Sequence, residues 1–163
     1  MINFSQNGMN QLLCNPKISE QEKFIINELK DEFEKKFGLT GYFLIRSSGS
    51  SQKSDESVRL IALSAESVLN SAARFNNYFK VGKEDCWGLV LPEYHVAGLA
   101  VHARAFLASS QVLSQSWNTI KLHNNLKSWI AENKITYMSM VPTQIFDIVH
   151  QNIKAPDNIK KIF

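Results

Sequence analysis

The sequence predicts an α/β fold, in which strands and helices alternate and most of the strands form a parallel sheet. From Ser64 onward, apolar runs of strand length alternate with segments whose apolar residues recur every three or four positions. Size supports the same class, because a chain of 163 residues that is 44% hydrophobic can bury a core without disulfides or a metal. No internal repeat or linker is visible, so residues 1–163 are expected to be a single domain or a fragment of a larger one.

The first predicted helix follows a lead without periodicity. Residues 1–18 are expected to be irregular. Ser19 and Glu22 then form a capping box, in which the Ser hydroxyl accepts from a backbone N–H and the Glu side chain reaches back to the cap. A helix is predicted over 19–37, with Gly38 as its C-terminal stop. Its apolar stripe consists of Ile25, Leu29, Phe33 and Phe37.

Residues 40–163 are expected to form the α/β portion of the chain. Strands predicted over 42–45 and 58–63 enclose the segment 46–57, which holds six Ser and one Gly and cannot pack in a core. Ser64 stands at the N-cap position of the helix that follows. The apolar face of that helix consists of Val68, Leu69, Ala72, Phe75 and Phe79.

The alternation continues to the end of the sequence. The predicted elements are, in order, a strand over 87–91, a buried helix over 98–107, a short strand over 111–113, a helix over 119–133, a strand over 135–141 and a helix opened by Pro142. The last helix is expected to place Ile145, Ile148 and Val149 on one face. The chain stops with the apolar residues Ile162 and Phe163 just as a further element begins within 158–163, which predicts a fragment of a longer chain.

Charge and cysteine content argue against several classes of protein. The net charge is only +3 and no basic block is present, so no nucleic-acid partner is expected. Cys14 and Cys86 lack the spacing of a metal or redox motif and predict reduced thiols in a cytoplasmic protein. No signal peptide or apolar run of membrane-spanning length is visible, so no membrane span is expected. An exposed sheet edge or an incomplete core would favour a homo-oligomer.

The serine-rich segment is the first with possible chemistry. Ser47-Ser-Gly-Ser-Ser51 combines hydroxyl donors with a glycine that lets several backbone N–H groups point at one spot, as a phosphate requires. It is neither a Walker A loop, because no Gly-Lys-Ser/Thr follows, nor a G-x-S-x-G nucleophile elbow. From composition alone, the alternative is a flexible hairpin connection.

Histidine and tryptophan residues give weaker signals. His95 follows the strand that ends near Pro92, where it either lines a pocket or is satisfied by backbone carbonyls. His102 lies on the same helical face, but two histidines without a third ligand do not make a metal site. Trp87 and Trp117 are expected to pack in the core rather than to stack on a ligand.

Several segments in collinear order resemble the acyl-CoA synthetase and adenylate-forming enzyme family, over roughly residues 40–163. Residues 47–51 are similar to the family's T-S-G-S/T-T phosphate loop, and 59–64 to the segment that begins with the loop's basic residue. Residues 91–99, Leu-Pro-Glu-Tyr-His-Val-Ala-Gly-Leu, are similar to L-P-L-F/Y-H-V-G/A-G-L. The following helix carries Arg104, which recurs in the ligase group. Residues 135–144 resemble V-T-x-x-x-x-V-P-T-Q, and the nearest members are the o-succinylbenzoate–CoA ligases of menaquinone biosynthesis.

The resemblance implies an activity and a set of binding residues. Members of the family activate a carboxylic acid with ATP and Mg²⁺ and then transfer the acyl group to CoA, so a small carboxylic acid, ATP and CoA are the implied partners. The implied phosphate-binding residues are Ser47, Ser48, Gly49, Ser50, Ser51 and Arg59. The implied acyl-substrate residues are His95, Gly98 and Thr143, although Thr143 could equally be only the first turn of a helix. The resemblance assigns no catalytic residue and no metal ligand to this chain.

Departures from the family pattern leave a second hypothesis open. The family loop continues G-x-P-K, whereas residues 52–57 lack both Gly and Pro, so Lys53 rivals Arg59 as the loop's cation. Glu93 replaces an apolar residue. No segment resembles the family's adenine- or ribose-binding parts, so the chain is expected to be an N-terminal portion that binds no cofactor tightly and is inactive alone. The alternative is a non-catalytic binding or structural module that retains the scaffold.

Overall fold

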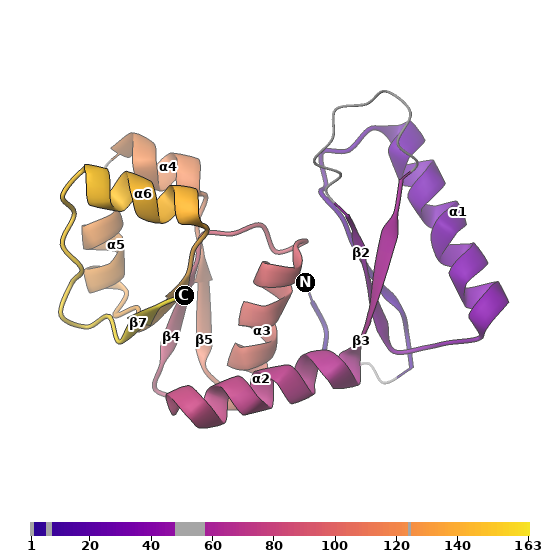
Figure 1. Cartoon of the computed structure of the whole chain (residues 1–163), viewed down its shortest axis with the longest axis horizontal. Helices are drawn as coiled ribbons and strands as arrows, with labels where there is room; N and C mark the ends of the chain where they lie inside the picture. Colours follow the sequence, from indigo (N-terminus) through magenta and orange to yellow (C-terminus); the bar gives the residue numbers. More distant parts are fainter. Residues whose placement is uncertain (1, 6–7, 48–57, 124) are drawn as a thin grey trace.

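The structure is a computed structural model that describes residues 2–5, 8–47, 58–123 and 125–163. Its elements, in chain order, are β1 (Gln11–Leu13), α1 (Glu20–Phe37), β2 (Tyr42–Arg46), β3 (Leu60–Ser64), α2 (Ala65–Phe79), β4 (Cys86–Leu89), α3 (Val96–Ala108), β5 (Gln111–Ser114), α4 (Trp117–His123), α5 (Leu126–Glu132), β6 (Tyr137–Ser139), α6 (Pro142–His150) and β7 (Lys161–Ile162). The α/β class is confirmed, but the strands form two sheets rather than one (Figure 1).

The first sheet has three strands in the order β1-β2-β3. β2 and β3 form an antiparallel hairpin whose register runs from Tyr42 opposite Ser64 to Arg46 opposite Leu60. β1 pairs parallel with the other edge of β2. The expectation of an irregular lead over 1–18 is therefore wrong at Gln11–Leu13, because a three-residue strand is too short to give a periodic signal.

Helix α1 has the predicted caps but buries a different residue. Ser19 Oγ accepts from the Glu22 backbone N–H at 3.2 Å, and Gly38 takes the left-handed conformation at the C-terminal end with φ 59°. Ile26 is the buried residue of this helix, whereas Phe37 is 56% exposed. The predicted stripe therefore fails at its last member, because the helix extends past the edge of the short sheet that it covers.

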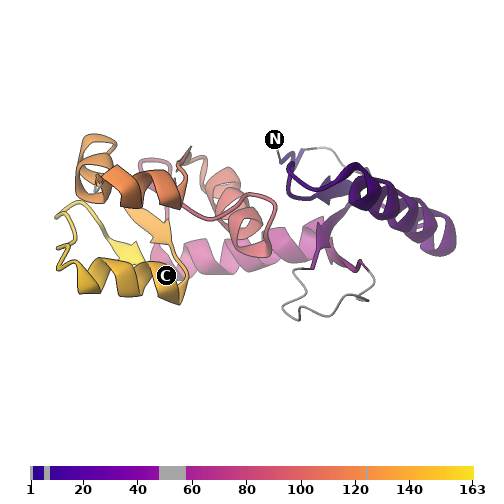
Figure 2. The ribbon, with the colours of Figure 1, turned by 90° about the horizontal axis from the view of Figure 1, so that it is seen from above.

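The second sheet has four parallel strands in the order β5-β4-β6-β7. Helices α2 and α3 cover one face, where Trp87, Leu89 and Tyr137 pack. Helices α4, α5 and α6 cover the other face, where the buried residues include Cys86 and Met138 (Figures 1 and 2). Successive residues of a strand point to opposite faces of the sheet. Because both faces are covered by helices, β4 is apolar throughout.

Three expectations in the second half of the chain need correction. The helix predicted over 119–133 is two helices, α4 and α5, and Asn125 stands at the N-cap position of the second. The break falls there because Asn is unfavourable in a helix interior and favourable at a helix start. The strands predicted over 87–91 and 135–141 are shorter than expected. Val149 does not share the buried face of α6, since it is 68% exposed.

The two sheets are joined through α2 and α3. α2 follows β3 directly, as Ser64 is both the last residue of that strand and the N-cap, accepting from the Ser67 backbone N–H at 3.2 Å. Phe43 and Ile45 of the first sheet pack against Leu99 of α3 in one buried cluster. None of the helices in the described part of the chain has the length and apolarity needed to cross a membrane.

Candidate functional site

The predicted phosphate loop leaves and rejoins the sheet at the end of the β2–β3 hairpin. The Ser47 backbone N–H donates to the Arg59 carbonyl oxygen at 3.0 Å, which extends the ladder one step beyond the pair of Arg46 and Leu60. The Arg59 side chain is exposed. The other predicted phosphate-binding residues, Ser48, Gly49, Ser50 and Ser51, lie outside the described residues, as does the rival cation Lys53.

His95 occupies the N-cap position of α3, in the turn that follows β4. Its backbone N–H donates to the Pro92 carbonyl at 3.1 Å, and its carbonyl accepts from the Leu99 N–H at 3.0 Å. The imidazole makes no capping hydrogen bond, and it lies 4.9 Å from the ring of Tyr94, measured between ring centroids. The backbone is thus fixed by hydrogen bonds, while the side chain is half-buried and makes no capping hydrogen bond.

Gly98 lies where the turn before α3 folds back onto the helix. A Cβ atom at this position would stand 2.4 Å from the Pro92 carbonyl oxygen and 2.8 Å from Glu93 Cα. Both atoms belong to the backbone and cannot move aside as a flexible side chain could. The glycine is therefore required by this close approach, so the described contacts give it a packing role within the turn that carries His95.

Thr143 is exposed in the first turn of α6, and its neighbour Gln144 is buried. Gln144 Oε1 accepts from the Val141 backbone N–H at 3.0 Å, and Gln144 Nε2 donates to the Val90 carbonyl at 3.3 Å. Sequence reasoning missed Gln144. The available signal was its place three residues after Val141, the position from which a Gln side chain can reach back to cap a helix.

His95 and Thr143 follow two neighbouring parallel strands, β4 and β6. Because parallel strands end at the same edge of a sheet, the starts of α3 and α6 meet there. Gln144 links the two ends directly through Val90, which follows β4. In open α/β sheets, ligands bind at the carboxyl edge. The structure thus brings His95, Gly98 and Thr143 to one sheet edge, and it places Ser47 and Arg59 on the other sheet.

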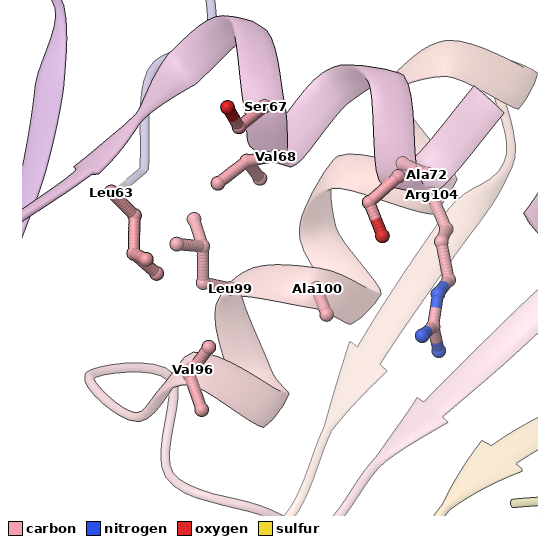
Figure 3. Close-up of a pocket in the computed structure, with 9 residues that line it drawn as sticks. Leu63, Ser67, Val68, Ala72, Val96, Leu99, Ala100 and Arg104 are labelled. Atoms are coloured by element: carbon pink, nitrogen blue, oxygen red, sulfur yellow. The ribbon is translucent and has the colours of Figure 1, made fainter. Parts of the chain in front are cut away.

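A cavity of about 220 Å³ lies between α2 and α3 (Figure 3). Its walls are mainly apolar, and the polar residues among those that line it are Ser67, Ser71 and Arg104. The lining residues are Leu63, Ser67, Val68, Ser71, Ala72, Val96, Leu99, Ala100 and Arg104. Figure 3 shows Leu63 and Val96 at one side of this space and Arg104 at the other.

Arg104 is a half-buried cation without a carboxylate partner in the described part of the chain. Its guanidinium carbon lies 3.7 Å from the centroid of the Phe75 ring and 5.6 Å from that of Trp87. Within the described residues, no Asp or Glu oxygen approaches it to 4.0 Å. Burial lowers the pKa of Arg104, but an arginine remains charged at neutral pH. An apolar cavity with one such cation suits an anion that has an apolar body.

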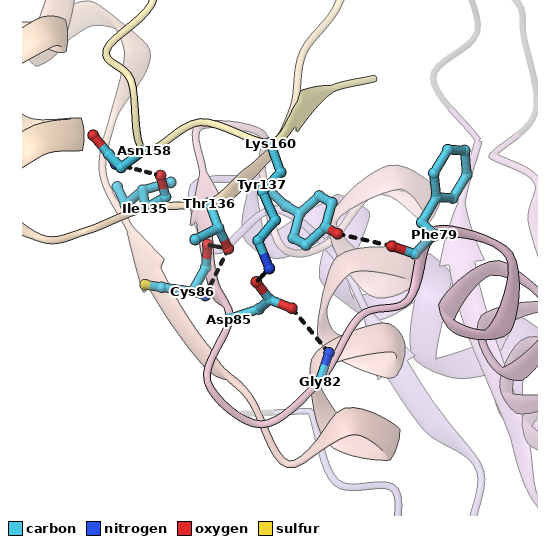
Figure 4. A network of polar contacts seen from close by, with 9 residues as sticks. All are labelled: Phe79, Gly82, Asp85, Cys86, Ile135, Thr136, Tyr137, Asn158 and Lys160. Carbon is cyan, nitrogen blue, oxygen red and sulfur yellow. Dashed lines mark hydrogen bonds and ion pairs between the residues drawn. The ribbon is translucent and has the colours of Figure 1, made fainter.

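The opposite, amino edge of the four-stranded sheet is closed by a polar network (Figure 4). The carboxylate of Asp85 accepts from Lys160 Nζ at 2.6 Å and from the Gly82 backbone N–H at 2.9 Å. Burial alone would raise the pKa of Asp85, but these hydrogen bonds and that of Thr136 outweigh it and lower the pKa. The hydrogen bond to Asp85 raises the pKa of Lys160. Every polar group here has a partner, so the network is structural.

Other candidate centres are missing from the described residues. Between positions 2 and 163, apart from the gaps in the description, no three His, Cys, Asp or Glu side chains are placed to hold a metal ion. Neither Cys14 nor Cys86 forms a disulfide, and burial raises the pKa of the Cys86 thiol. A reactive cysteine would need the opposite shift.

Comparison with solved structures identifies the fold. Unliganded o-succinylbenzoate coenzyme A synthetase from Bacillus subtilis matches with a TM-score of 0.69 at 15% identity, over 94% of this chain and 39% of that chain. The same enzyme in complex with ATP and magnesium ion matches with a TM-score of 0.60 at 18% identity, over 74% and 24%. The adenylation domain of a keto acid-selecting peptide synthetase module, bound to keto acyl adenylate, matches at 0.55 and 16% identity, over 68% and 19%.

These likenesses show that the chain has the fold of part of a domain of adenylate-forming enzymes. The chain spans only 19% to 39% of the lengths of these three proteins. No family model matches the sequence, and no curated protein matches it either.

Proposed function

We propose that this chain is part of an ATP-dependent acid–CoA ligase that works through an acyl-adenylate, with o-succinylbenzoate as the acid. The observation that carries the proposal is the arrangement at the carboxyl edge of the four-stranded sheet. There His95 and Thr143 follow adjacent parallel strands, and the cavity with Arg104 lies along the helix that His95 begins. The likeness to adenylate-forming enzymes supports the proposal through the fold.

The acid substrate is inferred from the charge and shape of the cavity. Arg104 follows His95 on the same helix, roughly 13 Å further along at 1.5 Å per residue. A ligand near both side chains would carry an anionic group for Arg104 and an apolar body against the cavity walls; the helix rise does not fix the distance between its charged groups. o-Succinylbenzoate has two carboxylates on an aromatic scaffold. In the proposal, Arg104 holds one carboxylate, and the other lies near His95.

The reaction itself then has two steps. A carboxylate oxygen of the acid attacks the α-phosphorus of ATP and pyrophosphate leaves; the sulfur of CoA next attacks the acyl carbon and AMP leaves. Hydrogen-bond donors aimed at developing charge lower the barrier of such a step. His95 would donate to the reacting acyl group, and Ser47–Ser51 with Arg59 or Lys53 would hold the phosphates. ATP, Mg²⁺ and CoA are the implied cofactors, in a cytoplasmic enzyme of menaquinone biosynthesis.

Calorimetry with o-succinylbenzoate tests the acid site on the 163-residue chain itself. The comparison uses the wild type, Arg104→Met, and Arg74→Met as a matched control on the exposed side of α2. Methionine keeps an apolar stem against Phe75 and removes only the charge. Loss of one charge-assisted contact of 1.5–3 kcal/mol predicts binding weaker by about 10- to 100-fold. Equal affinity of Arg104→Met and wild type would refute the assignment of this site.

A further inference from the structure

Glu93 connects the turn before α3 to two other elements. Its Oε1 accepts from Ser114 Oγ, at the end of β5, at 2.9 Å. The same oxygen lies 3.5 Å from Nε2 of His102, two turns into α3. The side chain is 49% exposed, so it reaches both groups along the surface of the sheet edge. One carboxylate thus bridges a turn, a strand end and a helix.

The turn that Glu93 holds is the one that carries His95. The other contacts described for this turn are made within the turn itself or with α3. The His95 N–H donates to Pro92 within the turn, and the space left by Gly98 lets the turn lie against α3. Among the described contacts, the hydrogen bond to Ser114 is the one that ties the turn to β5.

His102 supplies a second reason why this position holds a carboxylate. Its Nε2 atom is buried and has no hydrogen-bond partner in the described part of the chain. A buried polar nitrogen is costly unless a charge or an acceptor faces it. Of the acidic side chains in the described residues, Glu93 is the one within 4.0 Å. A leucine at position 93 would remove the hydrogen-bond acceptor of Ser114 and the carboxylate that faces His102.

We propose that Glu93 is a positioning residue for His95, supported by His102 and Ser114. Its described contacts are with Ser114 and His102, and through them it fixes the turn that carries His95. The inference rests on the proposed function only for the role of His95 in binding the acid. The restraint that Glu93 places on the turn can be measured on the chain without a ligand. These contacts give a structural reason for a carboxylate at position 93, where the family resemblance predicts an apolar residue.

Native-state amide hydrogen exchange, followed by NMR on the 163-residue chain, tests the restraint. Glu93→Leu removes both contacts, whereas Glu93→Gln keeps an acceptor for Ser114 and removes the charge that faces His102. Glu132→Gln is the matched control, an exposed carboxylate at the end of α5. In Glu93→Leu the His95 amide should exchange about five- to tenfold faster than in wild type, with Glu93→Gln in between.

Two further readings separate positioning from general destabilisation. The Ile45 amide lies in β2 of the other sheet, and its exchange rate should stay within twofold of wild type. The His95 ring resonances should move in Glu93→Leu and stay unchanged in Glu132→Gln. A His95 rate within twofold of wild type in Glu93→Leu, or an equal rise at His95 and Ile45, would overturn the proposal.

Binding of o-succinylbenzoate distinguishes failure of this inference from failure of the proposed function. If the wild type binds the acid, Glu93→Leu should bind it at least threefold more weakly, and Glu132→Gln equally well. Unchanged affinity in Glu93→Leu would show that Glu93 does not position His95 for the ligand. If the wild type binds no acid, the proposed function fails, and the exchange rates alone decide whether Glu93 restrains the turn.

Discussion

The two sheets of this chain hold their candidate binding residues in different ways. In the three-stranded sheet, the segment between β2 and β3 is fixed by the two ends of an antiparallel hairpin, where Ser47 bonds to Arg59. In the four-stranded sheet, residues after β4 and β6 are fixed by helix starts, by the close approach at Gly98 and by the side chain of Gln144. Under the proposed function, the edge of the parallel sheet binds the acid, and the segment between β2 and β3 binds the phosphates.

The largest expected effect is that of His95→Ala, which tests whether the two regions have the separate roles proposed for them. In the complete ligase that we propose contains this chain, His95→Ala should slow acyl-adenylate formation by about 10²–10³ without an equal loss of ATP affinity, because the proposal assigns the phosphate contacts to the hairpin. Single-turnover kinetics separates the rate from substrate binding. A change of less than twofold in both the rate and the affinity for the acid would remove His95 from the site.

The next effect compares backbone packing at one glycine in each of the two regions. Gly98→Ala places a methyl group against the Pro92 carbonyl oxygen and should destabilise the fold by about 3 kcal/mol. Gly41, at φ 76° in the first sheet, has open space around its Cβ position, so Gly41→Ala should cost only the conformational strain of about 1–2 kcal/mol. Urea unfolding measures both values. Equal costs would show that the turn before α3 can relax.

The ion pair of Asp85 and Lys160 at the amino edge should stabilise the four-stranded sheet in a pH-dependent way. Lys160→Met should cost about 1.5 kcal/mol, since Asp85 is only 4% exposed but Lys160 is 55% exposed. Lys83→Met is the control, as its pair with Glu84 is fully on the surface. Amide exchange should rise in β4 and β6 of the Lys160 variant more than in β2.

The direction of the pH dependence follows from the two shifted pKa values. The folded-state pKa of Asp85 is lowered, so its stabilisation is present above the unfolded value of about 4 and is lost as the pH falls through the lowered value. The pKa of Lys160 is raised, so its stabilisation is present below about pH 10.4 and is lost as the pH rises through the raised value. The cost of Lys160→Met should therefore shrink as the pH falls through that lowered value; a cost that stays constant across the acid titration of Asp85 would contradict the pairing.

The smallest expected effect lies at α1. Ser19→Ala removes the hydroxyl that caps the Glu22 N–H and should cost about 1 kcal/mol. Because α1 packs against β3 and its Glu22 pairs with Arg46 of β2, exchange should rise in α1 and leave β6 unchanged. Circular dichroism and exchange together measure this loss. An equal rise of exchange in α1 and β6 would mean that the two regions unfold as one unit.

The fold was largely predictable because its signals are local. The capping box at Ser19, the N-cap at Ser64 and the apolar runs of β2 and β4 each depend on neighbouring residues, and the structure confirms them. β1 was missed, and the element that begins within 158–163 was not assigned as a strand, because strands of three and two residues exist only through their pairing partners. The break between α4 and α5 was missed because apolar spacing continues across Asn125.

The candidate site was predictable only in part, for the same reason. His95, Gly98 and Thr143 lie in segments that could be recognised along the chain. Gln144, the partners of Glu93 and the cavity beside Arg104 depend on contacts between distant elements, such as the hydrogen bond from Gln144 to Val90. Periodicity and motif spacing carry no information on such pairs.

The most direct test of the proposed acid site is an NMR titration of the ¹⁵N-labelled chain with o-succinylbenzoate, with benzoate as the single-carboxylate control. The account predicts shifts centred on the turn at Glu93–His95 and on Val96, Leu99 and Arg104 along the cavity, and weaker shifts with benzoate. Resonances of α1 should not move. The absence of any shift up to about 1 mM acid, a concentration that corresponds to only about 4 kcal/mol of binding free energy, would contradict the account, as would shifts centred on α1.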